Sequence, residues 1–98
     1  MAKYAIAFDL DTDTLSNTYC GNNANNAYYD IKTTLEKYGF SRQQGSVYFG
    51  DDTVDAVKTV MAARKLATKY SWFAPSVKDI RMLRIEDDND LRLAILDD

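Results

Sequence analysis

The residues best placed for chemistry in this sequence are the acids that follow its first apolar stretch. From Tyr4 to Asp11, large apolar residues alternate with small or acidic ones. This period of two, in a segment rich in β-formers, predicts a β-strand. Asp9 and Asp11 stand at its carboxyl end, where sheets in mixed α and β proteins commonly hold ligands. The same acids could instead only solvate the strand exit.

Composition excludes several kinds of site. The 98-residue chain has no histidine, which excludes a histidine acid–base pair, a serine–histidine triad and a histidine-rich metal site. A net charge of −3 provides no overall attraction to nucleic acid, so any such contact would need a local basic patch. The single cysteine, Cys20, excludes an internal disulfide and suits a reducing compartment. With no long apolar run at the N-terminus, we expect a cytoplasmic protein without a membrane span.

Two readings of the acidic run from Asp9 to Asp13 fail on spacing. In a calcium-binding loop, Thr14 would have to be glycine and Cys20 would have to be glutamate. The run also loosely resembles the aspartyl nucleophile motif of haloacid dehalogenase-type phosphatases. That motif spaces its third polar residue differently, and its fold needs a larger domain than this chain supplies.

The first half of the chain predicts a loop, a helix and a hairpin. Five asparagines and Gly21 between Asp11 and Asn26 predict a loop, with Asn22 or Asn23 as a helix N-cap. Asp11 and Asp13 would then be solvated loop residues. The predicted helix follows from 24 to 38, with Gly39 at its end. Two short strands, 40–43 and 46–49, form a hairpin around Gln44-Gly45, with a bulge in the first strand.

The second half predicts a helix, a strand and a tail. We expect the helix over 53–70, capped by Asp51-Asp52. Its predicted core-facing residues are Ala56, Val60, Ala63, Ala67 and Tyr70, with Val57 and Leu66 beside them and Lys58, Lys65 and Lys69 opposite. Trp72 and Phe73 should cover one end of the core. The strand follows over 77–86. The apolar tail, 88–98, could form a short helix or an added strand, and we expect it to dock on the sheet or on a partner.

The order strand–helix–strand–strand–helix–strand predicts a single α+β domain over 1–98, with the ferredoxin-like βαββαβ plan. Two helices can cover only one face of its four-stranded antiparallel sheet. The other face would carry Ala5, Ala7 and Asp9, with residues of the last strand beside them. A homodimer across these faces would cover that surface.

Four segments in the same order resemble the family of virulence-associated protein D, VapD: YAIAFDLD, NNAYYDI, YGFSRQQGSVYFG and WFAPSVKDIRMLRIED. This family is related in fold to CRISPR-associated protein 2. The resemblance implies a ferredoxin-like homodimer and an endoribonuclease with RNA as substrate. It also implies action as the toxin of a toxin–antitoxin pair where an antitoxin partner exists.

The resemblance also implies site residues. Asp9 matches the family's strand-end acid and is the first choice for a catalytic residue, while Asp79, in the VKDIR segment, would be a second acid of the site. Ser46 matches the hairpin serine, expected to hydrogen-bond a phosphate oxygen, and Arg42 the hairpin arginine, expected to bind the substrate's phosphate. Without histidine, cleavage needs either a carboxylate base acting on the 2′-hydroxyl or a metal such as Mg²⁺ held by acids, with Asp9 as its ligand. Two Asp9 side chains meeting in a dimer could serve either route.

Each of these residues also has a plain structural interpretation. Ser46 could satisfy the hairpin backbone, Arg42 could form a rim salt bridge, and Asp79 could balance neighbouring cations. The aromatic residues could stack on bases but are more often core or interface. The alternative function is therefore a non-catalytic dimeric scaffold that binds nucleic acid or protein.

Overall fold

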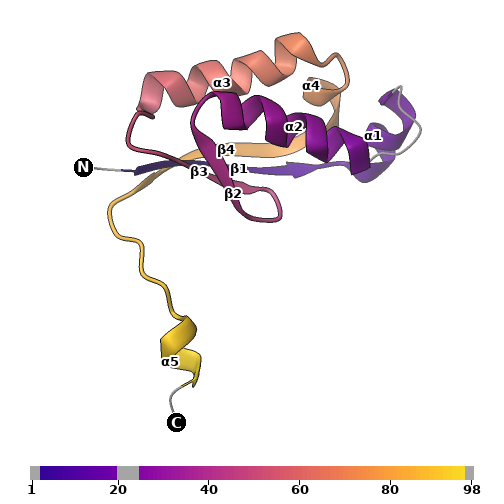
Figure 1. Ribbon diagram of the computed structural model, residues 1–98. Helices are drawn as coiled ribbons and strands as arrows, with labels where there is room; N and C mark the ends of the chain where they lie inside the picture. Colours follow the sequence, from indigo (N-terminus) through magenta and orange to yellow (C-terminus); the bar gives the residue numbers. More distant parts are fainter. Residues whose placement is uncertain (1–2, 20–24, 97–98) are drawn as a thin grey trace.

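The computed structural model describes residues 3–19 and 25–96. A four-stranded antiparallel sheet with the order β2-β3-β1-β4 carries the two long helices, α2 and α3, on one face (Figure 1). The elements are β1 (Lys3–Leu10), α1 (Thr12–Thr18), α2 (Asn25–Lys37), β2 (Phe40–Gln44), β3 (Val47–Gly50), α3 (Ala56–Lys69), α4 (Phe73–Ser76), β4 (Val77–Ile85) and α5 (Arg92–Leu96). The predicted ferredoxin-like α+β plan is confirmed, with three short helices added to it.

The core lies between the sheet and the two long helices. Alternation along β1 directs Ile6, Phe8 and Leu10 into it, and all three are buried. Helix α2 supplies Ala27, Ile31 and Leu35 at the predicted three- and four-residue spacing, each fully buried. Trp72 and Phe73 cover one end of this core, as expected, and their rings pack edge to face.

The segment after β1 corrects one prediction. Thr12–Thr18 forms helix α1 where the sequence indicated only loop. Asp11 is its N-cap, because its carboxylate accepts a hydrogen bond from the Thr14 amide at 3.0 Å. Leu15 anchors the helix by lying buried in the core. The asparagine-rich composition of this segment predicted a loop and hid the pattern of one N-cap, Asp11, and one buried residue, Leu15. The predicted N-caps Asn22 and Asn23 lie outside the described residues.

Helix α3 corrects the predicted start and core face of the second long helix. It begins at Ala56 rather than Thr53, and its N-cap is Asp55, which accepts from the Lys58 amide at 2.8 Å. Its buried residues are Thr59, Ala62 and Leu66. The predicted core face was wrong in part, because Val60 and Ala67 are exposed, whereas Tyr70 does pack against the core. Thr59 can be buried although it is polar, because its hydroxyl is satisfied within the helix: Thr59 Oγ1 donates to the Asp55 carbonyl at 2.7 Å. Val57 and Val60 are left exposed instead.

The hairpin is confirmed in its main features. Gly45 and Ser46 form a two-residue turn between β2 and β3. The pairing of β2 with β3 shifts register between Arg42 and Gln44, which is the expected bulge. Gly39 follows α2 with a φ of 94°, the left-handed conformation predicted for a glycine at this position.

Gly39→Ala is expected to destabilise the fold by about 1–2 kcal/mol, because an L residue resists the left-handed conformation. An added Cβ would also lie 3.0 Å from the Asp51 carboxylate. Gly45→Ala is the matched control for the contact with Asp51: Gly45 also has a positive φ, though a smaller one of 29°, and a Cβ added there would meet no atom within 4 Å. Urea unfolding of both variants measures the difference. Equal stability of the two variants would contradict this account of Gly39.

The face of the sheet turned away from α2 and α3 is called the open face. Cross-strand partners share a face, so the register places Ala5 with Phe49 and Leu83, and Ala7 with Val47 and Arg81, on this side. Phe49 and Val47 are half-buried and Leu83 is 43% exposed. The centre of the open face is therefore apolar, as predicted for a surface that a second copy would cover.

The tail extends away from the domain on the side of the open face, and α5 stands clear of the sheet (Figure 1). The tail is a helix rather than an added strand. Its large apolar residues are exposed: Leu91, Leu93, Ile95 and Leu96. It does not pack on its own sheet, and docking on a partner stays a prediction. No helix in the described ranges has the length and apolar character needed to cross a membrane.

Candidate active site

Two carboxylates lie on neighbouring strands of the open face. Asp9 on β1 and Asp79 on β4 are cross-strand partners, so their side chains leave the sheet on the same side. Both are exposed. The register of β1 with β4 shifts directly after this pair, where Leu10 is paired with Val77 and Lys78 has no opposing residue. Bulges of this kind are frequent next to active sites because they redirect side chains.

An arginine completes the group. Arg81 Nε lies 2.9 Å from Asp79 Oδ2, and Arg81 is paired with Ala7, so it shares the open face with Asp9. At such an exposed position the ion pair contributes little to stability. It does place a guanidinium beside two acids, where it could contact a phosphate. Sequence reasoning missed Arg81, although the two-residue spacing from Asp79 along a strand already put both residues on one face.

The backbone of Ser46 lies beside the end of β1 that carries Asp9. Its carbonyl accepts a hydrogen bond from the amide of Phe8, the residue before Asp9, at 3.1 Å. This backbone bond ties the hairpin turn to β1 at the level of the acid pair. The turn therefore forms one border of the site, and the role of the Ser46 hydroxyl stays a prediction.

Arg42 lies elsewhere. It is paired with Tyr48, whose partner on β1 is Ile6, so it belongs to the helix side of the sheet, two strands from β1. Its Nε donates to the Gly45 carbonyl at 2.9 Å, bracing the hairpin. Within one subunit, this arrangement favours the plain structural interpretation of Arg42. Its role in binding substrate stays a prediction.

The carboxyl end of β1 is held firmly beneath the acids. The Asp11 amide donates to the Ser76 carbonyl at 2.7 Å, and the buried Ser76 hydroxyl donates to the Trp72 carbonyl at 2.7 Å. The Thr14 amide holds the pKa of Asp11 below its ordinary value, because it hydrogen-bonds the ionised form. Asp11 is thus a capping residue rather than a member of the acid pair.

Asp9 and Asp79 supply only some of the ligands that a metal ion needs. Among the residues that the structure describes, no group of three or more potential protein ligands could hold a metal ion. Mg²⁺ is often bound by one or two carboxylates, with phosphate oxygens and water completing the shell. Asp9 and Asp79 fit that pattern within one copy, and a second Asp9 would fit it in a dimer.

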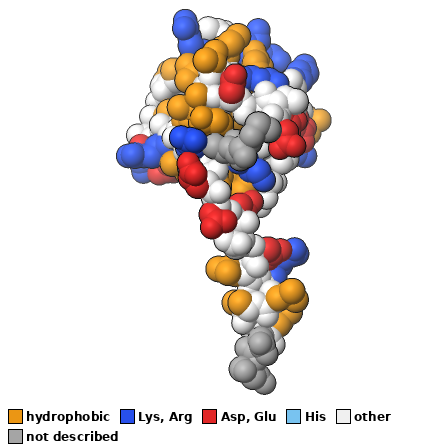
Figure 2. Space-filling view, turned by 90° about the vertical axis from the view of Figure 1, so that its left-hand side faces the viewer, with side chains coloured by type: hydrophobic (Ala, Val, Ile, Leu, Met, Phe, Trp, Pro, Cys, Tyr) orange, Lys and Arg blue, Asp and Glu red, His pale blue; other side chains and the backbone are white. Residues whose placement is uncertain are grey.

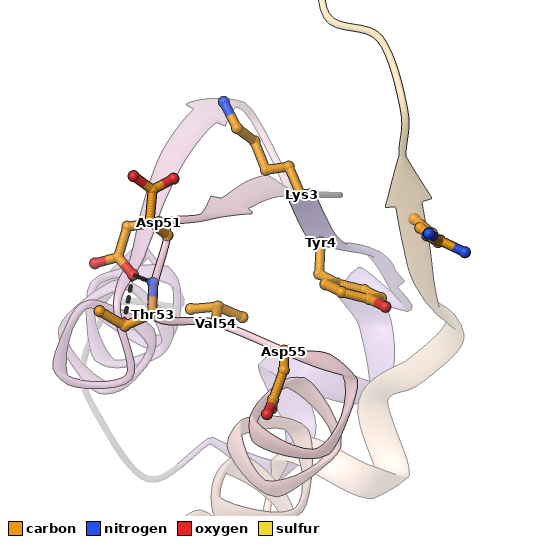
Figure 3. Close-up of a pocket in the computed structure, with 8 residues that line it drawn as sticks. Lys3, Tyr4, Asp51, Thr53, Val54 and Asp55 are labelled. Carbon is orange, nitrogen blue, oxygen red and sulfur yellow. Dashed lines mark hydrogen bonds between the residues drawn. The ribbon is translucent and has the colours of Figure 1, made fainter. Parts of the chain in front are cut away.

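A polar pocket lies at the other end of β1 and does not include the acid pair. It has a volume of about 430 Å³, and its lining residues include Lys3, Tyr4 and Asp55. Figure 3 shows these side chains around the opening, with Asp51 turned to Thr53. The Thr53 hydroxyl and amide hydrogen-bond Asp51 and lower its pKa. That carboxylate is occupied in shaping the turn before α3.

This sheet, with Asp9 near the end of β1 and Asp79 beside it on β4, belongs to the Cas2-like class: the family model of CRISPR associated protein Cas2 matches residues 1–92. Within that class, the chain belongs to the VapD endoribonuclease family. It is 50% identical over 92 residues to Endoribonuclease VapD 2 of Riemerella anatipestifer, covering 94% of this chain and 98% of that protein.

Two further relatives support the assignment. An Endoribonuclease VapD homolog of Helicobacter pylori is 49% identical over 92 residues, covering 94% of this chain and 95% of the relative. Endoribonuclease VapD of Dichelobacter nodosus is 42% identical over 87 residues, covering 89% and 90%. The resemblance found in four segments of the sequence is thereby confirmed over nearly the whole chain.

Proposed function

We propose that this chain is an endoribonuclease that cleaves RNA as a homodimer, with Asp9 at its active site. The observation that carries the proposal is the exposed Asp9–Asp79 pair on a sheet face that no long helix covers. The names of its VapD relatives as endoribonucleases support the reaction class. In its family context we further propose a cytoplasmic toxin with an antitoxin partner.

The acid pair suggests a route for cleavage. Asp9, ionised, would accept the proton of the 2′-hydroxyl while the 2′-oxygen attacks phosphorus. The bond from phosphorus to the 5′-oxygen then breaks, and the carboxyl of the second Asp9, in its protonated form, would return a proton to that oxygen. Arg81 would balance charge on the phosphate. Ser46 would donate a hydrogen bond to a phosphate oxygen.

The dimer would form through the open face. Phe49 and Leu83 provide an apolar centre for it, with the acid pair towards one end. Stacked sheets lie about 10 Å apart, so acids at the rim of one sheet can reach those of the other. Two Asp9 side chains would then share a cleft, together with Asp79 of each copy.

Removing divalent metal separates the two routes by which these acids could act. If Asp9 is a general base, chelator leaves the rate of RNA cleavage unchanged, because the proton transfer needs no metal. If Asp9 holds Mg²⁺ against the phosphate, chelator lowers the rate at least about 100-fold, since the metal supplies several kcal/mol of charge stabilisation. A labelled RNA incubated with protein in magnesium and then in chelator measures this. Readdition of magnesium is the control, and Asp9→Asn protein reports any contaminating nuclease.

A further inference from the structure

Helix α3 presents an exposed surface on the side that is turned away from the core. Its buried residues, Thr59, Ala62 and Leu66, share one side of the helix. Residues spaced by three, four and seven positions share the opposite side. They form what is called the α3 surface: Val57, Val60, Met61, Arg64, Lys65 and Thr68, all of them exposed.

The apolar part of the α3 surface is uncovered. Exposed fractions are 67% at Val57, 48% at Val60 and 56% at Met61. Two adjoining hollows of about 390 and 280 Å³ run along the helix here, and they share Met61 and Arg64. In the helix layer, at the top of Figure 2, hydrophobic side chains lie next to lysines and arginines. Apolar side chains gathered around hollows and bordered by charges mark an interaction site.

The charge of α3 is opposite to that of the rest of the chain. The helix contains four cations, Lys58, Arg64, Lys65 and Lys69, and no acid. Because the whole chain has a net charge of −3 and α3 contributes +4, the remaining residues carry −7. Among the described residues, none forms a hydrogen bond or ion pair with the charged end of Arg64 or Lys65. Two unpaired cations therefore border the apolar residues.

In the proposed dimer the α3 surface stays on the outside. The two open faces meet, whereas α3 covers the other face of each sheet (Figure 1). The chain's own tail also leaves on the open-face side, away from α3. Two α3 surfaces would not pair with each other, because their cations would repel. The surface is therefore available to a molecule other than this chain.

A protein fits the α3 surface better than RNA or a membrane does. RNA phosphates would pair with Arg64 but would leave Val57 and Met61 in water. Helices that bind membranes bury large residues such as Trp, Phe and Leu, whereas the apolar residues here are two valines and a methionine. The charge of −7 outside α3 would also be repelled by either phosphate-rich surface. Carboxylates beside apolar side chains match both properties of the surface.

The spacing of these residues suits a helix. Val57, Met61 and Arg64 succeed one another along α3 at intervals of four and three residues. A second helix that lies along α3 meets such a row with its own residues at the same intervals. Binding of an amphipathic helix by its apolar face is a common mode of protein recognition.

We propose that the α3 surface docks an acidic amphipathic helix of a partner protein. Its apolar side chains would lie on Val57, Val60 and Met61, and its carboxylates would pair with Arg64 and Lys65. The docking site is on the opposite side of the sheet from Asp9 and Asp79. It goes beyond the proposed RNA cleavage and does not depend on it.

Binding of a synthetic peptide to the full chain tests the proposal. The fluorescent peptide has three heptads, with leucine at a and d and glutamate at e and g, and the control peptide has lysine in place of glutamate. Fluorescence anisotropy should show the acidic peptide binding at least about ten times more tightly than the lysine peptide, because only its charges complement the surface.

Variants place the binding on α3. Arg64→Glu should weaken the acidic peptide at least about tenfold and strengthen the lysine peptide, since the charge of the surface is reversed. Met61→Asp should weaken the acidic peptide at least about tenfold, because a carboxylate replaces an apolar contact. Lys78→Glu is the matched control: it makes the same charge change at an exposed residue of β4, outside the α3 surface, and should leave binding unchanged. Circular dichroism checks the fold of each variant.

Three results would overturn the proposal. The first is wild-type protein that binds neither peptide at about 1 mM, the limit of weak affinity. The second is an equal loss of binding in Arg64→Glu and Lys78→Glu protein, which would show a general effect of charge. The third is binding to phosphatidylglycerol vesicles or to a labelled RNA that Arg64→Glu abolishes, in protein that does not bind the acidic peptide. That outcome would assign the surface to lipid or RNA.

Discussion

Asp9→Asn is expected to lower the rate of RNA cleavage by about 10²–10⁴-fold, the usual contribution of a positioned general acid or base. Asparagine keeps the size of the side chain but can neither accept the 2′-hydroxyl proton nor bind a metal as a carboxylate does. Since Asp9 is exposed on the open face and forms no ion pair within the described chain, the fold should be unaffected. Initial rates on a labelled RNA measure the effect.

The matched control is Asp52→Asn, the same change at an exposed acid before α3, at the far end of the sheet. It should cleave at the wild-type rate. Normal cleavage by folded, dimeric Asp9→Asn protein would reject Asp9 as the catalytic residue. Cleavage absent from wild type as well, with RNA still bound, would support the non-catalytic scaffold.

Leu83→Asp is expected to convert the proposed dimer to monomer, raising its dissociation constant by at least about 100-fold. A carboxylate at the centre of an apolar interface must lose its water without gaining a partner, which costs several kcal/mol. Leu83 is 43% exposed in a single copy, so the isolated subunit should fold almost normally. Sedimentation equilibrium measures the dissociation constant, and circular dichroism the fold.

Tyr29→Asp introduces the same charge at another exposed residue, 63% exposed on α2, and should leave the dimer intact. RNA cleavage by Leu83→Asp protein should fall together with dimer content. A Leu83→Asp chain that dimerises as tightly as wild type would exclude the open face as the interface.

The sequence predicted the architecture well where the patterns were strong. The alternation in β1 and the spacing of Ala27, Ile31 and Leu35 correspond to buried faces. Gly39 marked the end of α2 because a left-handed residue was needed there. Repeated local agreement of this kind suffices to define a small α+β fold.

The predictions failed at α3 and α1, where tertiary packing and not the hydrophobic pattern decides which residues are buried. Alanines and valines occur on several sides of α3, so hydrophobicity alone could not reveal that Thr59 faces the core and Val60 does not. Helix α1 depends on one cap and one buried leucine within a polar segment, a weaker pattern than a stripe.

The arrangement of the candidate site could not be predicted for a similar reason. The sequence proposed Asp9 and Asp79 as site residues, which stays a prediction, and only the register of β1 with β4 makes them cross-strand partners. The same register brings Arg81 to the acids, whereas Arg42 lies on the other side of the sheet. Strand order and pairing are long-range properties, which a local pattern does not determine.

The most direct test of the central claim follows cleavage and assembly in one dilution series. Labelled-RNA cleavage per chain and sedimentation are measured on the same wild-type samples, from well above to well below the dissociation constant. The account predicts that cleavage falls in step with the dimer fraction, because both copies form the cleft. Full cleavage per chain in samples that sediment as monomer would contradict it.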